Sequence, residues 1–183
     1  TWDGEVTQSD RLAAYAAAGE RLKAMGLLYP CRCTRADIAA AAQERGPDGP
    51  VYPGTCRLHP ADSAAGDVAW RLDMAKATAL TGSLTWDDDR AGAQVAQPGL
   101  FGDVVILRKE APASYHLAAT LDDAADGITL VTRGMDLFVA THIHRLLQAL
   151  LDLPVPRWHH HALLVEDDGR KLAKRRGSPS LAD

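Results

Sequence analysis

Hydrophobic side chains recur at the spacing of an α-helix over several stretches of this chain. The clearest stretch begins at the cap-forming pair Ser9 and Asp10 and ends at Gly26. A second stretch begins at Thr34, which is a favourable helix cap. Taken together, the pattern predicts helices over residues 8–26, 34–46, 114–127 and 136–153.

Other stretches alternate between apolar and polar positions, or form short apolar runs, and both patterns are typical of strands. For example, Val68, Trp70 and Leu72 alternate with Ala69 and Arg71. The pattern predicts strands over residues 68–74, 104–107 and 128–134, a loop rich in Pro and Gly over 46–54, and turns over 87–94. Residues 161–177 are predicted to form a strand, an acidic turn and a basic loop.

The order of these elements, strand followed by helix, is typical of an α/β layer architecture. A length of 183 residues suits one domain, or one domain with a small insertion. The chain begins at Thr1 without an initiator Met, which suggests a fragment of a longer protein.

Charge, hydropathy and cysteine content exclude several classes of protein. The formal net charge of −4 excludes a generally basic nucleic-acid coat, so any contact with nucleic acid must be local. No apolar run approaches the roughly 20 residues of a membrane span, and no secretory signal precedes the first helix. The odd number of cysteines favours a reducing cytoplasm, where thiols bind metals or stay free.

All three cysteines, Cys31, Cys33 and Cys56, lie in one short segment. Three thiols on a segment that folds back can supply three of the four tetrahedral ligands that zinc prefers. The alternative is a set of three buried, reduced cysteines. For the fourth ligand, His59 is the conventional choice, and Tyr52, four residues before Cys56, is the unconventional one.

A basic loop follows the last predicted strand. Within the segment Arg170–Arg176, Lys171 and Lys174 lie three residues apart, which suits cationic groups that converge on a polyphosphate. The alternative is a solvated basic tail.

Arg133 is predicted to lie where a strand meets the following loop and helix. Ligands of open α/β sheets bind at the carboxyl ends of strands, so this guanidinium is well placed to bind a carboxylate. The alternative is a surface ion pair with Asp136. Tyr115 begins a helix, where an aromatic residue is more often part of the core. The run His159–His161 predicts no metal site, because consecutive residues of a strand point to opposite faces.

Several stretches together resemble a known family. The sequence "SYHLAATLDDAADGITLVTRGMDLFVATHIHRLLQALLDLP", followed by "GRKLAKRRG", is similar to the glutamyl-tRNA synthetase group of class I aminoacyl-tRNA synthetases. The resemblance includes "WDGEVTQSDRLAAY" and "YPCRCT", and so covers essentially the whole chain. Within the group, the chain is most similar to the short members that lack an anticodon-binding domain.

The resemblance implies a fold and a domain organisation. Residues 1–183 would form the later part of a class I catalytic domain, which is α/β with a Rossmann-like parallel sheet, and residues 30–60 would form a zinc-binding insertion within it. The first class I signature, which contains two histidines, is absent, so we expect these residues alone to be inactive.

The resemblance also implies ligands for individual residues. Tyr115 and Arg133 would bind L-glutamate. Lys171 and Lys174 would be the catalytic lysines of the second signature loop, with Lys174 binding ATP. In that loop Ala173 and Arg175 stand where serines are usual, so hydroxyl contacts are lost.

For the metal, the family pattern implies one structural zinc ion. Its ligands would be Cys31, Cys33, Tyr52 and Cys56, with His59 as the second choice for the tyrosine position.

The implied activity is that of a cytoplasmic, monomeric enzyme with no membrane contact. It would activate L-glutamate with ATP and Mg²⁺ and transfer it to the queuosine base in the anticodon of tRNA(Asp). One alternative is the catalytic domain of a conventional glutamyl-tRNA synthetase that charges tRNA(Glu). Another is a non-catalytic, zinc-stabilised RNA-binding module.

Overall fold

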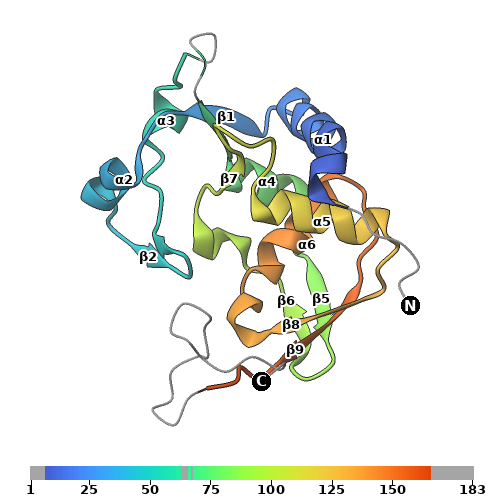
Figure 1. The fold of residues 1–183 in the computed structure, drawn as a ribbon. Coiled ribbons are helices and arrows are strands. Elements are labelled where there is room, and N and C mark those ends of the chain that lie inside the picture. Colours follow the sequence, from blue (N-terminus) through green and yellow to red (C-terminus); the bar gives the residue numbers. More distant parts are fainter. Residues whose placement is uncertain (1–6, 63–65, 67, 166–183) are drawn as a thin grey trace, which may run out of the picture.

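The computed structural model describes residues 7–62, 66 and 68–165 (Figure 1). The helices are α1 (Leu12–Ala24), α2 (Arg35–Ala41), α3 (Thr55–Leu58), α4 (Met74–Thr81), α5 (Tyr115–Ala125) and α6 (Thr141–Leu150), with short 3-10 turns η1 (Gln8–Arg11), η2 (Pro98–Phe101) and η3 (Met135–Leu137). The strands are β1 (Leu28–Cys31), β2 (Arg45–Gly46), β3 (Gly49–Pro50), β4 (Ala69–Leu72), β5 (Thr85–Asp88), β6 (Gly92–Val95), β7 (Val105–Leu107), β8 (Leu130–Gly134) and β9 (Arg157–His161).

The sheet that carries the candidate site has the strand order β6-β5-β9-β8. Strand β9 runs parallel to both β5 and β8, while β5 and β6 form an antiparallel hairpin. A second sheet, β1-β4-β7, is antiparallel throughout. The α/β class with a parallel sheet is therefore confirmed, and the antiparallel sheet is an addition that the sequence pattern did not predict.

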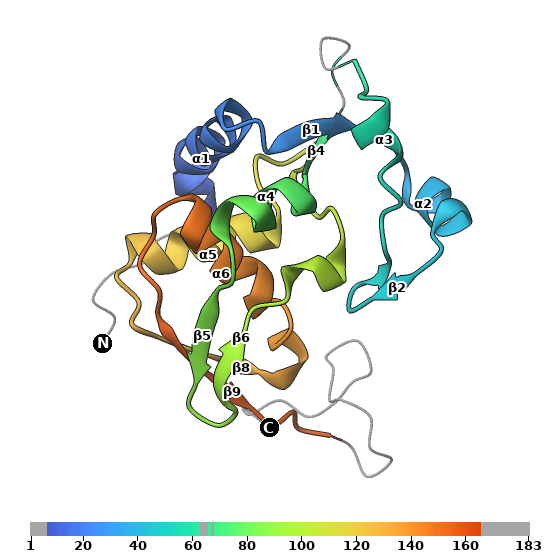
Figure 2. The same cartoon turned by 180° about the vertical axis from the view of Figure 1, so that it is seen from behind.

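Helices α5 and α6 lie between the two sheets and bury their apolar faces in one core (Figures 1 and 2). The fully buried side chains of this core come from four helices and from both strands of the β4–β7 pair: Leu22, Leu72, Ala77, Ile106, Leu117, Ile143, Leu146 and Leu147. Gly19 of α1 allows a close approach, because an added Cβ atom would lie 2.8 Å from the side chain of Leu107.

Between β1 and β4 the chain leaves the antiparallel sheet and forms α2, the hairpin β2–β3 and α3, which project to one side (Figures 1 and 2). This segment has its own small core of Tyr29, Cys31, Tyr52 and Cys56. It lies within residues 30–60, and its assignment as a zinc-binding insertion stays a prediction.

Most predicted helices and strands are present, with three differences. Helix α2 ends at Ala41 rather than at Gly46, because Ala42 already has extended dihedral angles (φ −69°, ψ 130°). The hairpin β2–β3 occupies the segment predicted as a loop. The turn-rich residues 87–94 include the turn of the β5–β6 hairpin, and the last described strand is 157–161 rather than a strand that begins at His161.

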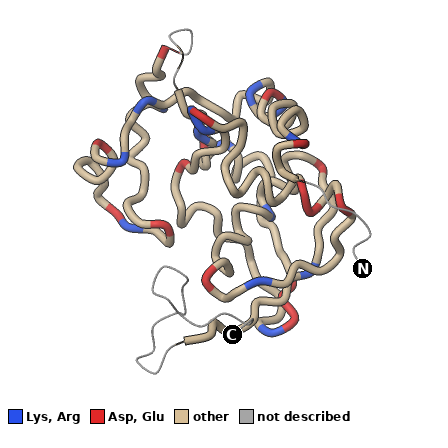
Figure 3. The backbone as a smooth tube through the Cα atoms, in the orientation of Figure 1, with Lys and Arg blue, Asp and Glu red and all other residues tan. Residues whose placement is uncertain are grey.

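Charged residues of both signs are interspersed along the described chain, in keeping with the modest net charge (Figure 3). Over this part of the chain, no helix has the length and apolar character that crossing a membrane requires.

Candidate active site and candidate metal centre

The guanidinium of Arg133, on β8, forms hydrogen bonds with tyrosine, threonine and histidine side chains. Its Nη1 lies 3.3 Å from the Tyr115 hydroxyl and 3.1 Å from Nδ1 of His144. Its Nη2 donates to Thr141 Oγ1 at 2.6 Å, and its Nε donates to Nε2 of His160 at 3.1 Å. Three elements converge here, because Tyr115 begins α5, Thr141 begins α6, and His160 lies on β9 opposite Arg133.

No carboxylate of the described chain forms an ion pair with this guanidinium. Burial lowers the pKa of Arg133, and the Tyr115 hydroxyl and the Asp123 carboxylate, which is too distant for an ion pair, offset only part of this effect. A buried cation that forms no ion pair is stabilised by a ligand that supplies negative charge. Tyr115 is 49% exposed, so it is not a core aromatic residue. The arrangement suits an anion that binds from the accessible side of Tyr115.

Tyr115 takes its position from the start of α5. The Ser114 side chain caps that helix by accepting the N–H of Leu117 at 3.4 Å, which makes Tyr115 its first residue. The structure thus brings together Tyr115 and Arg133, the two residues expected to bind the amino acid. Their role as glutamate ligands stays a prediction.

Behind Arg133, Asp88 of β5 and His160 of β9 form a fully buried pair. Nδ1 of His160 lies 2.7 Å from Oδ2 of Asp88, and the His160 backbone N–H donates to the same oxygen. The other oxygen, Oδ1, accepts the backbone N–H groups of Arg90 and Ala91. Burial alone would raise the pKa of Asp88, but these hydrogen bonds outweigh it and lower the pKa to about 2. Burial also lowers the pKa of His160, so the pair is an ionised carboxylate beside a neutral imidazole.

Sequence reasoning missed the partners of Arg133. Thr141 and His144 share the first turn of a helix that was predicted only as apolar, and Asp88 fell in a segment predicted as turns. His160 was considered only as part of the run His159–His161. As expected for a strand, that run alternates between faces: His160 is buried and His161 is exposed.

The three cysteines come together in the insertion. Their sulfur atoms all lie within 4.8 Å of one another, and no other set of three or more His, Cys, Asp or Glu residues in the described ranges does so. The Tyr52 hydroxyl lies 3.4 Å from the sulfurs of both Cys31 and Cys33, and it accepts the backbone N–H of Cys56 at 2.8 Å. His59 does not join this group. The Tyr52 hydroxyl is therefore the oxygen donor that lies beside the sulfurs, and its role as the fourth zinc ligand stays a prediction.

The donor set fits zinc. Tetrahedral zinc with Zn–S bonds of about 2.3 Å requires sulfur atoms about 3.8 Å apart, and Cys33 and Cys56 have their sulfurs 3.5 Å apart. Burial by itself would raise the pKa of the Cys56 thiol. Hydrogen bonds, first among them the one with Tyr52, outweigh this effect, and the net pKa is about 7. These residues are able to bind one metal ion, which would cross-link β1, the loop after β3, and α3.

Arg71 of β4 places a cation beside these donors. Its Nε lies 3.3 Å from Sγ of Cys31, and its guanidinium lies 3.9 Å from the centre of the Tyr52 ring. Its Nη1 donates to the backbone oxygen of Asp103 at 2.7 Å, which fixes the side chain. The positive charge would offset part of the negative charge of thiolate and phenolate ligands.

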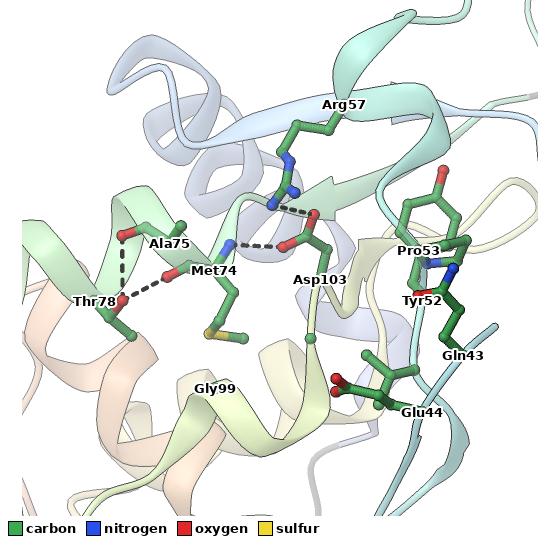
Figure 4. Close-up of a pocket in the computed structure, with 12 residues that line it drawn as sticks. Gln43, Glu44, Tyr52, Pro53, Arg57, Met74, Ala75, Thr78, Gly99 and Asp103 are labelled. Atoms are coloured by element: carbon green, nitrogen blue, oxygen red, sulfur yellow. Dashed lines mark hydrogen bonds and ion pairs between the residues drawn. The ribbon is translucent and has the colours of Figure 1, made fainter.

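A cavity of about 500 Å³ separates the insertion from α4 and η2 (Figure 4). Asp103 lies on its wall, where it pairs with Arg57 at 3.2 Å and accepts the backbone N–H of Met74 at 2.9 Å. Neither Tyr115 nor Arg133 lines this cavity. Lys171 and Lys174, predicted to bind ATP, lie outside the described residues, as does the rest of the segment Arg170–Arg176.

The chain is similar in sequence to one family of known proteins. The family described as class I tRNA synthetases (E and Q), catalytic domain, matches residues 1–183. The chain is 48% identical to a glutamyl-Q tRNA(Asp) synthetase of Rhodobacter capsulatus, over 100% of this chain and 70% of that protein. It is 40% identical to a protein of the same name from Symbiobacterium thermophilum, over 98% of this chain and 57% of that protein.

Among solved structures, the chain resembles a glutamate tRNA ligase from Elizabethkingia meningosepticum in complex with its amino acid, with a TM-score of 0.71 and 21% identity. That match covers 95% of this chain and 38% of the other, and at this identity it supports the fold alone.

Proposed function

The chain belongs to the catalytic-domain family of class I tRNA synthetases (E and Q). From this premise, we propose that the protein activates L-glutamate with ATP and transfers it to the queuosine base in the anticodon of tRNA(Asp). The names of the curated relatives support this choice of acceptor. The chain spans only 57% to 70% of the two relatives described, so the activity belongs to the full-length protein.

The observation that carries the proposal is the guanidinium of Arg133 beside Tyr115, which forms no ion pair with any carboxylate of the described residues. Four of the five guanidinium hydrogens are directed at Tyr115, His144, Thr141 and His160, and the remaining one, on Nη2, has no partner in the described part of the chain. Because the Tyr115 hydroxyl accepts from Arg133, its own hydrogen is available to donate. The second Nη2 hydrogen of Arg133 and the hydroxyl hydrogen of Tyr115 are therefore available to donate to the two oxygens of a carboxylate.

In the proposed reaction, the α-carboxylate of glutamate attacks the α-phosphorus of ATP, and pyrophosphate leaves. A nucleophilic group of the queuosine base then attacks the carbonyl carbon of the adenylate, and AMP leaves. Since the α-carboxylate must stay free to react, Arg133 and Tyr115 suit the side-chain carboxylate. Binding there would separate glutamate from glutamine, because an amide cannot neutralise the buried cation.

ATP binding is assigned to Lys174, with Lys171, as the family resemblance implies. Lysine ammonium groups stabilise the charge that develops on the phosphates. We further propose that Mg²⁺ accompanies ATP, that the zinc held by Cys31, Cys33, Tyr52 and Cys56 is structural, and that the enzyme is a cytoplasmic monomer.

The test supplies the full-length protein with labelled glutamate, ATP and one of three RNAs: tRNA(Asp) with queuosine, tRNA(Asp) without it, or tRNA(Glu). The proposal expects label only on tRNA(Asp) that carries queuosine. Label on the 3′ end of tRNA(Glu) would identify a conventional synthetase. No glutamate-dependent reaction would favour a non-catalytic RNA-binding module.

A further inference from the structure

The hydrogen-bond directions around His160 admit only one arrangement of its protons. The Nε of Arg133 can only donate, so Nε2 of His160 must accept. An ionised Asp88 can only accept, so Nδ1 of His160 must donate. His160 is therefore neutral and carries its hydrogen on Nδ1, and its Nε2 lone pair faces the guanidinium.

The same reasoning applies to the second imidazole. Nη1 of Arg133 donates to Nδ1 of His144, so His144 carries its hydrogen on Nε2. That hydrogen points to Nδ1 of His116 at 3.3 Å, and Nε2 of His116 lies 3.9 Å from Oδ2 of Asp48. Two neutral imidazoles thus act as acceptors for one guanidinium. If either acceptor nitrogen bound a proton, its N–H would face an N–H of Arg133, and the resulting imidazolium would repel the guanidinium.

We propose that Asp88 and His160 are positioning residues that hold Arg133 in its anion-binding orientation by fixing the His160 tautomer. They do not touch the ligand. Asp88 acts on Nδ1 of His160, and His160 acts through Nε2 on Nε of Arg133, so that the guanidinium keeps the orientation in which Nη1 contacts Tyr115 and Nη2 contacts Thr141. The identification of the anion as a glutamate carboxylate rests on the proposed function. The assignment of the His160 tautomer rests only on its hydrogen bonds to Arg133 and Asp88.

Asp88 divides its two roles between its two oxygens. Oδ1 accepts Arg90 N–H at 2.9 Å and Ala91 N–H at 2.8 Å, which stabilises the turn between β5 and β6. Oδ2 accepts only from His160 among the described residues. In Asp88→Asn, the amide oxygen can keep the turn, while the amide N–H₂ group faces both Nδ1 and the backbone N–H of His160. The imidazole hydrogen is then driven to Nε2, where it opposes the Nε–H of Arg133.

The first measurement reads the tautomer directly in the full-length protein. Two-bond ¹⁵N–¹H spectra of the histidine rings distinguish the Nδ1–H from the Nε2–H form, and the signals of His160 are assigned by their loss in His160→Gln. The expected result is the Nδ1–H form in the native protein and the Nε2–H form in Asp88→Asn. A native His160 with its hydrogen on Nε2, or one that is unchanged in Asp88→Asn, would overturn the proposal.

The second measurement is glutamate-dependent ATP–pyrophosphate exchange. Asp88→Asn should raise the KM for glutamate by about tenfold to a hundredfold, as losses of supporting hydrogen bonds do elsewhere, and leave the KM for ATP nearly unchanged. His160→Gln keeps an acceptor oxygen and should lose less than His160→Leu. The matched control is His142→Gln, which alters a buried imidazole of the same core that bonds to Trp86 and not to Arg133.

The outcomes separate the two proposals. An equal rise in the KM for glutamate in Asp88→Asn and His142→Gln would mean a general loosening of the core, and the positioning role would be wrong. A native protein without glutamate-dependent exchange would contradict the proposed function, while the ring spectra would still decide whether Asp88 fixes His160.

Discussion

The hydroxyl of Tyr115 lies 3.3 Å from Nη1 of Arg133, although 18 residues separate them in the chain. Tyr115 begins α5 and Arg133 lies near the end of β8, so the contact joins a helix start to the carboxyl end of a parallel strand. This is where ligands of α/β sheets bind. The two side chains therefore lie where a ligand is expected to bind, and their role as glutamate ligands stays a prediction.

The first prediction concerns Arg133→Lys. An ammonium cannot reproduce the planar set of hydrogen bonds to Tyr115, Thr141 and His160, so the cation would lose its orientation. Hydrogen bonds to charged groups are worth about 1.5–3 kcal/mol each, so the KM for glutamate should rise by about tenfold to a hundredfold. Steady-state exchange assays with varied glutamate, and then with varied ATP, measure this.

The control for that experiment is Arg145→Lys. Arg145 lies on α6 and donates to the backbone oxygen of Thr85, outside the site. It should leave the KM for glutamate within about twofold of the native value, as surface changes away from a site do. Equal effects of Arg133→Lys on glutamate and ATP would indicate a folding defect.

The fold class and the position of Arg133 at the end of a strand were predictable from local sequence patterns, whereas a shared site for Tyr115 and Arg133 was implied only by the family resemblance. Helix caps such as Ser114 and buried runs such as Val105–Leu107 are local signals. The strand β1 was not predicted, because Pro30 interrupts its pattern. Pro is tolerated there since β1 lies at the edge of its sheet.

The partners of Arg133 were not predictable in the same way. Asp88 and His160 are 72 residues apart, and they meet only because β5 and β9 are adjacent in the sheet. The residues Thr85–Asp88 show a clear buried–exposed alternation in the structure, but in sequence the following run of aspartates suggested a turn. Tertiary pairing, not local pattern, creates this part of the site.

The second prediction concerns the metal ligands. The purified full-length protein should contain about one zinc ion per chain, as a complete set of tetrahedral donors implies. Tyr52→Phe keeps the ring and removes the donor oxygen, so zinc affinity in a chelator competition should fall at least about tenfold. His59→Gln is the control and should bind zinc like the native protein. If His59→Gln loses zinc and Tyr52→Phe does not, the assignment of the fourth ligand is wrong.

The third prediction concerns Arg71 as a support for that site. Arg71→Gln removes the cation that lies beside Cys31 and over the Tyr52 ring. The negative charge of the metal ligands is then offset less. Zinc affinity should therefore fall by about tenfold to a hundredfold, as it does when supporting residues of other metal sites are changed. Chelator competition at constant pH measures the change. Unchanged affinity would mean that Arg71 only packs against the ring.

The fourth prediction concerns Lys174. If its ammonium stabilises the phosphates of ATP during adenylate formation, Lys174→Ala should slow glutamate-dependent pyrophosphate exchange by about a hundredfold or more. Lys76→Ala is the control, because Lys76 is an exposed lysine of α4 that pairs with Asp73. An exchange rate equal to that of Lys76→Ala would mean that the segment Arg170–Arg176 is a solvated tail.

The last prediction concerns pH and stability through His142. Its imidazole is buried, its Nδ1 accepts Trp86 Nε1–H at 3.2 Å, and burial lowers its pKa below 6.5. In the unfolded chain the imidazole binds a proton near pH 6.5, whereas in the folded protein it stays neutral to lower pH. The unfolded state then holds more protons, so the stabilising contribution is complete above pH 6.5 and is lost as pH falls through the folded pKa.

Between those two pKa values, His142 contributes a slope of up to about 1.4 kcal/mol per pH unit to the free energy of unfolding. His142→Gln offers an amide oxygen to Trp86 but does not titrate. Urea unfolding of both proteins from pH 8 to pH 5 should give a shallower pH dependence for the variant below pH 6.5. The difference between the two curves isolates His142 from Asp88, His160 and the thiols, which titrate in both proteins. Parallel curves would show that His142 takes up its proton equally in the folded and unfolded states.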